Sequence, residues 1–222
     1  MNKKPELENE YYNKRASEYE QIYFRDDKIR RAEIDDEVTR LKELTKGKKV
    51  TELACGTGYW TSRVSETALE IITSDLSLEM ILEAKKKEYH CPIQFIQADL
   101  HTPPFEKSSC EFLLLGFWFS HEPKQNYDRF FKMLLELLQP DGKIWMIDNN
   151  PPAEGSSHDS IGEDEFGNNI KRRFLDDKTE FSIIKNYFSK DQLAELFTPY
   201  FEIESLIHNK YYWSTVLRAK ID

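Results

Sequence analysis

Residues 49–58 have the sequence KVTELACGTG, and this stretch decides the fold. Its first part, Lys49–Ala54, has the composition of a short β-strand, and a helix is expected to begin near Tyr59. Glycines at such a bend permit positive φ and let a ligand approach the backbone closely. Free N–H groups at the start of the helix favour a negative group nearby. These features predict a nucleotide-like ligand, with a carboxylate or a phosphate satisfying the amides equally well.

Strands and helices alternate along the next ninety residues. Further strands are expected at 69–73, 93–97, 111–116 and 143–148, with helices from Tyr59 to before Leu69, after an N-cap at Ser77 and from Pro123. The residues Gln139–Gly142 predict a turn before the fifth strand. This alternation indicates a parallel sheet covered on both faces. The apolar run at 111–116 is typical of a central, buried strand.

Two further regions flank this core. On the N-terminal side, Tyr12, Ala16, Tyr19 and Tyr23 share one face of an expected helix over Glu10–Phe24, and a second helix carries Ile34, Val38, Leu41 and Leu44 and stops at Gly47. On the C-terminal side we expect a long loop at 151–169, a hairpin of 171–175 with 179–185, a helix at 189–197 with a capping box, and an antiparallel pair at 201–207 and 211–219.

Two acidic residues end successive strands. Asp75 follows the second strand, where a carboxylate can accept hydrogen bonds from both hydroxyls of a ribose. Asp99 follows the third strand, where it can meet the exocyclic amine of an adenine. Open α/β sheets bind their ligands at this edge, so both acids are expected beside Gly56.

These features together resemble a class I S-adenosylmethionine (SAM)-dependent methyltransferase of the small-molecule type. The similar segments are 52–58, Asp75, 98–100 and the turn at 138–142, and they cover residues 48–149 well. Ala54 is a departure, because the family often has Gly there. The replacement should cost little if φ is negative at this position.

The resemblance implies a doubly wound α/β fold. Its mostly parallel seven-stranded sheet would have the order 3-2-1-4-5-7-6, with the last strand antiparallel and with extra N-terminal helices. Residues 1–222 would form one domain. Its parts would be a helical lid (1–46), a SAM-binding core (47–149), a substrate-side loop and hairpin (150–188), and a C-terminal helix with an antiparallel strand pair (189–222).

The same resemblance supplies the expected cofactor site, with SAM as the cofactor and no metal. The residues implied to hold SAM are Glu52, Ala54, Cys55, Gly56, Thr57, Gly58, Asp75, Leu76, Asp99, Leu100, Gly116 and Phe117. Two roles stay open for Glu52, which either braces the loop or holds the SAM ammonium group. Cys55 is expected to be a small filler, because no His or second Cys flanks it.

On the substrate side, His121 is the candidate general base, with a backbone-bonded structural histidine as the alternative. Phe117, Trp118 and Phe119 form either an apolar wall or plain core. Tyr12 and Tyr19 are candidate lid residues, with core packing as the alternative. Arg172 and Arg173 favour an anionic substrate, whereas the acids at 154, 159 and 163–165 favour a cationic one. The two hints conflict, so the sequence leaves the acceptor open.

Composition narrows the classes of function. The 222 residues carry 31 Lys and Arg against 40 Asp and Glu, a formal charge of −9, which argues against general nucleic-acid binding. Three cysteines without CxxC spacing indicate neither a zinc site nor a disulfide framework. No signal peptide or membrane span is evident, so a cytoplasmic location is expected. The oligomeric state stays open.

Two other functions remain possible at this stage. The first is an NAD-dependent oxidoreductase, although its GxGxxG loop would need Gly where Thr61 stands. The second is a protein that binds SAM without turnover. For a methyltransferase, the expected reaction is transfer to an O, N, S or C nucleophile by in-line displacement, with catalysis that depends mainly on positioning.

Overall fold

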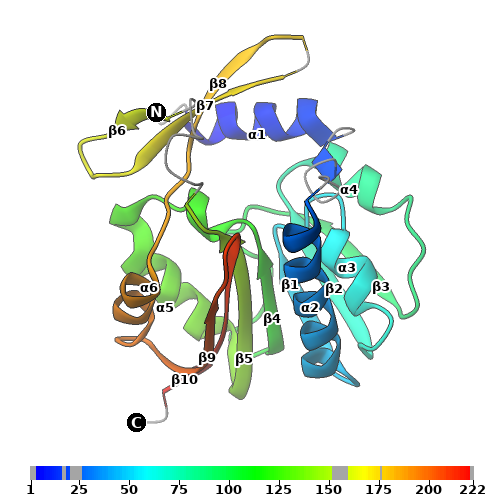
Figure 1. Cartoon of the computed structure of the whole chain (residues 1–222). Coiled ribbons are helices and arrows are strands. Elements are labelled where there is room, and N and C mark those ends of the chain that lie inside the picture. Colours follow the sequence, from blue (N-terminus) through cyan, green and yellow to red (C-terminus); the bar gives the residue numbers. More distant parts are fainter. Residues whose placement is uncertain (1–3, 17–18, 21–26, 152–159, 176, 221–222) are drawn as a thin grey trace.

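A seven-stranded sheet forms the centre of the molecule. The computed structural model describes residues 4–16, 19–20, 27–151, 160–175 and 177–220 (Figure 1). The strands of the sheet are β1 (Lys49–Leu53), β2 (Glu70–Asp75), β3 (Ile93–Gln97), β4 (Cys110–Gly116), β5 (Leu138–Asn149), β9 (Phe201–His208) and β10 (Tyr212–Ala219). Their order is β3-β2-β1-β4-β5-β10-β9, and β10 runs antiparallel to both of its neighbours. The structure therefore confirms the expected doubly wound sheet.

Helices cover both faces of this sheet. They are α2 (Lys28–Thr45), α3 (Tyr59–Val64), α4 (Leu78–Ala84), α5 (Tyr127–Leu137) and α6 (Lys190–Phe197). In Figure 1, α2 and α3 lie on one side of the sheet, and α5 and α6 lie on the other. The central strand β4 serves both layers, because Phe112 and Leu114 pack in the cluster that includes α2 and α3. Leu113 and Leu115 pack in the cluster that includes α5 and α6. Ser77 caps α4, and the Ser189–Gln192 capping box forms as expected.

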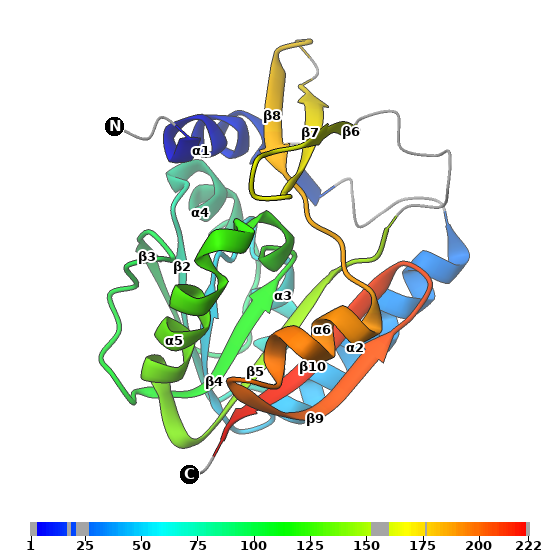
Figure 2. The same cartoon turned by 90° about the vertical axis from the view of Figure 1, so that its left-hand side faces the viewer.

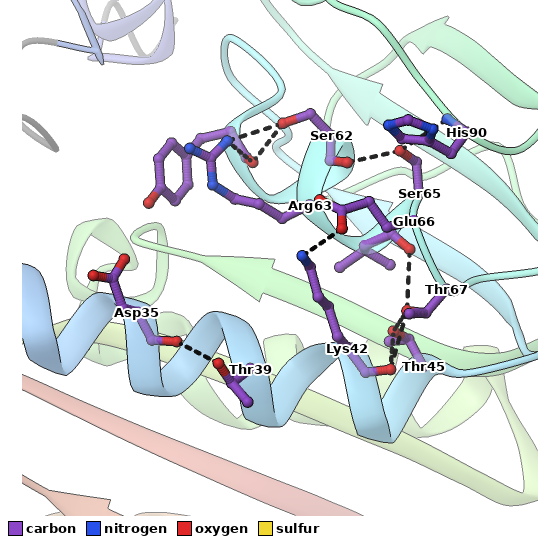
Figure 3. Close-up of polar contacts among 12 residues, drawn as sticks. Asp35, Thr39, Lys42, Thr45, Ser62, Arg63, Ser65, Glu66, Thr67 and His90 are labelled. Atoms are coloured by element: carbon purple, nitrogen blue, oxygen red, sulfur yellow. Dashed lines mark hydrogen bonds and ion pairs between the residues drawn. The ribbon is translucent and has the colours of Figure 1, made fainter.

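The N-terminal helix α2 is held by polar as well as apolar contacts. The buried Glu33 carboxylate accepts hydrogen bonds from the backbone N–H groups of Lys210 and Tyr211, at 3.0 and 2.9 Å, in the turn between β9 and β10. At the other end of α2, Lys42 donates to Glu66, and its carbonyl accepts a hydrogen bond from Thr67 (Figure 3). These contacts fix α2 against the hairpin and the end of α3.

Above the sheet lie α1 (Lys4–Arg15) and a small antiparallel sheet of β6 (Ser160–Glu163), β7 (Asn169–Phe174) and β8 (Glu180–Ile184) (Figure 2). The pairing of β7 with β8 confirms the predicted hairpin. The prediction of a continuous loop at 151–169 was wrong in part, because residues 160–163 pair with β7. Residues 152–159, with Glu154 and Asp159, lie outside the described part of the chain.

Two element boundaries also differ from expectation. The first α-helix ends at Arg15 and does not continue to Phe24, and beyond this break Tyr19 lies next to Gly56. Tyr23 falls outside the described residues. The turn predicted at Gln139–Gly142 is part of β5, because Leu138 pairs with Cys110 before the register shifts. None of the helices in the described segments combines the length and apolar character needed to cross a membrane.

Replacing Glu33 tests the polar attachment of α2. Glu33→Ala should lower the free energy of unfolding by about 1–3 kcal/mol, because two partly buried N–H groups lose their acceptor. Glu43→Ala, at an exposed position on the same helix, is the control and should change stability little. Urea unfolding measures both. Equal effects of the two substitutions would show that the Glu33 contacts do not hold the helix.

Candidate functional site

A cavity of about 450 Å³ lies at the carboxyl ends of β1, β2, β3 and β4. Eight of the twelve residues implied to hold the cofactor line it, in pairs from the four strand ends: Ala54 and Gly56, Asp75 and Leu76, Asp99 and Leu100, Gly116 and Phe117. The other four, Glu52, Cys55, Thr57 and Gly58, are not part of its wall. The two acids and the glycine bend are therefore gathered at one hollow, as the order of the strands requires.

Asp75 organises the loop between β1 and α3. Its Oδ2 accepts a hydrogen bond from Gly56 N–H at 2.8 Å, and its Oδ1 accepts one from Ser77 N–H at 2.9 Å. A carboxylate has about four lone-pair sites, so capacity for further donors remains on the cavity side. Burial raises the pKa of Asp75, while the backbone hydrogen bonds act in the opposite direction. The site can accept two hydroxyl donors such as those of a ribose.

The backbone amides of this loop are largely used within the protein. Cys55 N–H donates to the Ser74 carbonyl at 2.9 Å, and Gly58 N–H donates to the Cys55 carbonyl at 3.0 Å. Together with the Gly56 bond, three amides of the bend have partners already. These three amides are therefore not available to an anion, whereas the expectation of free N–H groups concerned the start of the helix near Tyr59. A pyrophosphate ligand, which needs such amides, fits this loop less well than an adenosyl group with a ribose does.

The four loop residues outside the cavity wall have structural contacts. Buried Glu52 accepts hydrogen bonds from Thr61 Oγ1 at 2.5 Å and Thr73 Oγ1 at 3.3 Å, and burial raises its pKa to about 8. These contacts are those of a residue that braces the loop, which is one of the two roles left open for Glu52. Thr57 donates to Glu20, and burial raises the pKa of the Cys55 thiol. Gly58 has φ of +76°, and a Cβ there would lie 3.0 Å from the Ala84 Cβ, so this position favours glycine.

Ala54 adopts a left-handed conformation with φ of +53°, and Gly56, two residues later, has φ of +54°. We expected a low cost for alanine only at negative φ, and that condition is not met. A residue with a Cβ pays about 1–2 kcal/mol in this region. The bend between β1 and α3 therefore holds a strained alanine at a position where the family that the sequence resembles often has glycine.

The roof and far wall of the cavity come from other parts of the chain. Tyr12, Tyr19, Trp118, His121 and Ile184 all line it. Phe119, by contrast, is buried in the core with α5 and α6, so the proposed aromatic wall contains only Phe117 and Trp118. Arg172 and Arg173 are not part of the wall, and Arg172 pairs with Glu180 across the β7–β8 hairpin. The acids Glu163, Asp164 and Glu165 are also absent from the wall.

His121 has a defined orientation. Its Nδ1 lies 2.7 Å from the Ile184 carbonyl oxygen, and its Nε2 lies 3.3 Å from the Tyr12 hydroxyl. Because a carbonyl only accepts, Nδ1 carries the proton, and the lone pair of the neutral ring is on Nε2. Burial, with the positive charge of Lys185, lowers the pKa of His121 to about 3. The ring is therefore neutral at physiological pH.

Sequence reasoning missed several polar residues of the site. His101, Glu122 and Arg129 line the cavity, and His101 Nε2 lies 3.4 Å from Glu122 Oε2. Behind His121, buried Lys185 donates to Asp148 at 2.9 Å and to Ser120 at 2.6 Å. Asp148 had a detectable signal, since it is an acid at the end of a central strand. Lys185 had none, because only the folding of the β7–β8 hairpin brings it there.

Known proteins share this architecture. A family model described as a methyltransferase domain matches residues 50–142. A demethylmenaquinone methyltransferase of Lactococcus lactis subsp. lactis strain IL1403 is 30% identical over 154 residues, which are 65% of this chain and 59% of the relative. A Bacillus licheniformis enzyme of the same name is 26% identical over 121 residues, or 53% and 51% of the two chains. The chain thus spans little more than half the length of these curated relatives.

Solved structures match over nearly the whole chain. The DhpI–SAM–HEP complex is 25% identical with a TM-score of 0.80, covering 98% of this chain and 99% of the other. The PH0226 protein of Pyrococcus horikoshii OT3, at 22% identity and a TM-score of 0.70 over 88% and 93%, shares the fold. The fold of this chain is that of the class I SAM-dependent methyltransferases, and residues 50–142 match a methyltransferase domain. Its cavity fits the cofactor, because Asp75 keeps acceptor capacity toward a ribose and Leu76 and Leu100 offer apolar surface for an adenine. The NAD-dependent alternative finds no support in these matches.

Replacing Ala54 tests the strained bend. Ala54→Gly should raise the free energy of unfolding by up to about 1 kcal/mol, because glycine tolerates positive φ. The matched control is Ala194→Gly in the interior of α6, where glycine should lower stability by about 1 kcal/mol. Thermal or urea unfolding gives both values. A loss of stability in Ala54→Gly would show that Ala54 is not strained.

Glu52 gives a pH-dependent prediction. Its pKa is about 8 in the folded protein against an ordinary value of 4.5, so the folded state binds its proton more firmly. The resulting stabilisation is complete below about pH 4.5 and is lost as the pH rises through 8. We therefore expect the stability of the wild type, relative to Glu52→Gln, to fall between pH 5 and 9 in urea unfolding. A constant difference over this range would contradict the raised pKa.

Proposed function

We propose that this protein transfers a methyl group from SAM to a nucleophilic atom of a small molecule. The observation that carries the proposal is the gathering of Gly56, Asp75 and Asp99 around one cavity, in a chain of the SAM-dependent fold. SAM supplies a methyl group on a sulfonium, which is a good leaving group. The protein then needs mainly to bind, orient and shield the reacting atoms, and such positioning supplies much of the rate enhancement.

In this proposal the cavity has two ends. Asp75 would accept hydrogen bonds from the ribose hydroxyls, and Asp99 with Leu100 would contact the adenine. Gly116 and Phe117 would face the methionine part and the methyl group. Tyr12, Tyr19, His121 and Ile184, which line the cavity from outside the cofactor motifs, would surround the acceptor. Tyr12 lies on α1 and Tyr19 follows that helix, so the N-terminal segment would exclude water from the reaction.

Support for a small acceptor comes from the relatives, whose names denote enzymes that methylate demethylmenaquinone. The roofed shape of the cavity points the same way, because α1 and the β7–β8 hairpin lie over the strand ends (Figure 2). A cytoplasmic location and the lack of general nucleic-acid binding stay predictions from the sequence. Binding of SAM without turnover stays the alternative to catalysis.

The ribose contact can be tested by substitution. Asp75→Ala should weaken binding of S-adenosylhomocysteine by about 100-fold, because each hydrogen bond to a charged acceptor contributes about 1.5–3 kcal/mol. Glu79→Ala, at an exposed position nearby on α4, is the control and should bind normally. Titration calorimetry gives both affinities, with circular dichroism to verify folding. Unchanged affinity in Asp75→Ala would show that the Asp75 carboxylate does not bind the ribose.

Turnover can be tested with isotope-labelled SAM. Incubation with a cell extract should yield a labelled small molecule, and Asp75→Ala should yield far less. Tight binding of SAM with no labelled product from extracts or from panels of amines, phenols, thiols and acids would favour the non-catalytic alternative. Failure to bind SAM at all would refute the proposal itself.

A further inference from the structure

Glu20 joins the N-terminal segment to two parts of the cofactor site. Its Oε1 accepts a hydrogen bond from Thr57 Oγ1 at 2.8 Å and another from the ammonium group of Lys87. Thr57 lies in the bend between β1 and α3, and Lys87 lies just after α4, the helix that follows Asp75. One carboxylate therefore links three segments that are far apart in the sequence.

The residue before Glu20 lies at the cavity. Tyr19 is part of the cavity wall, together with Gly56 and Asp75. A Cβ on Gly56 would lie 3.9 Å from Tyr19 Cε1, so the tyrosine ring is next to the glycine bend. Glu20 itself is not part of the wall. It therefore acts on a bound cofactor through the position of the Tyr19 ring.

The contact of Lys87 with Glu20 differs from that of the neighbouring lysine. Lys86 pairs with Glu83, three residues before it, and the side chain of Lys86 is 68% exposed. The side chains of Lys87 and Glu20 are 23% and 30% exposed. Salt screens a partly buried ion pair less than an exposed one, so the Glu20 contact should contribute more than the Lys86 contact.

The same N-terminal segment also reaches the opposite wall of the cavity. The hydroxyl of Tyr12, on α1, lies 3.3 Å from Nε2 of His121. The rings of Tyr12 and Tyr19 meet edge to face, with their centroids 6.2 Å apart. The two tyrosines therefore cover the cavity from His121 to the glycine bend, and Glu20 attaches this cover on the side of the bend.

We propose that Glu20 is a positioning residue that keeps Tyr19 over bound SAM and thereby slows the exchange of the cofactor. The proposal rests on the proposed binding of SAM in this cavity. Thr57 and Lys87 contact Glu20 outside the wall, so these contacts do not use the cofactor as a partner. Their loss should speed entry and release of the cofactor together and leave its affinity nearly unchanged. A residue that only shapes the site would instead weaken the affinity.

Exchange rates test this role. Binding of S-adenosylhomocysteine to the full chain is followed by stopped-flow fluorescence of Trp118, which lines the cavity. The observed rate plotted against ligand concentration gives the association rate constant as its slope and the dissociation rate constant as its intercept. Glu20→Gln and Lys87→Met should each raise both constants about 5- to 10-fold, with the dissociation equilibrium constant within about 3-fold of the wild type. Lys86→Met is the matched control and should leave both rates unchanged.

Charge reversal gives a stricter test of the ion pair. Glu20→Lys and Lys87→Glu, made singly, place like charges beside each other and should speed exchange at least as much as Glu20→Gln does. The double variant restores the pair in the opposite sense and should bring both rates back toward the wild type. Circular dichroism verifies that each variant is folded.

The outcomes separate this role from the proposed function. Unchanged rates in Glu20→Gln, or a weaker affinity with an unchanged association rate, would overturn the role of Glu20 alone. Additive effects in the charge-reversal double variant would overturn the ion pair as its cause. A wild-type chain that does not bind S-adenosylhomocysteine would overturn the proposed function as well.

Discussion

The hydrogen bond from Gly56 N–H to Asp75 Oδ2, at 2.8 Å, joins the end of β1 to the end of β2, and the cofactor site depends on it. The bond positions the Asp75 carboxylate beside the glycine bend and gives the Gly56 N–H a hydrogen-bond partner. A phosphate would need those amides, whereas a ribose needs the carboxylate. The loop is therefore suited to an adenosyl ligand in a way that the glycines alone do not reveal. The left-handed Ala54 lies two residues before Gly56 and shows that the bend is held against some backbone strain.

A second constraint acts at the other end of the cavity. The β7–β8 hairpin brings Ile184 and Lys185 to the turn after β4, so one segment fixes both the tautomer of His121 and the charge behind it. The buried ion pair of Lys185 with Asp148 links the hairpin to β5 at a site where charges are costly to bury. Perturbed ionisable groups gathered beside a cavity are typical of functional sites. The small sheet thus contributes to the chemistry of the site as well as to its roof.

Local signals predicted the parts of the fold that are repeated and periodic. The alternation of strands and helices fixed the parallel core, and Asp75 and Asp99 could be placed because parallel strands end at one edge of a sheet. The end of α1 at Arg15 could not be read from the helical periodicity. The strand at 160–163 was missed because this segment has few apolar residues, although its pairing with residues 169–171 is local. Lys185 could not be predicted either, because only the β7–β8 hairpin brings it to Asp148 and Ser120. The hydrogen bonds from Thr61 and Thr73 to Glu52 could not be predicted, because a single sequence does not show where these side chains lie in space.

The structure of the complex with S-adenosylhomocysteine is the most direct test of this account. We expect one ligand per chain, with the ribose hydroxyls on the carboxylate of Asp75, the adenine beside Asp99 and Leu100, and the sulfur directed toward His121 and Tyr12. A ligand found elsewhere, or an Asp75 carboxylate that bonds only Gly56 and Ser77 while the ribose lies apart from it, would contradict the central claim.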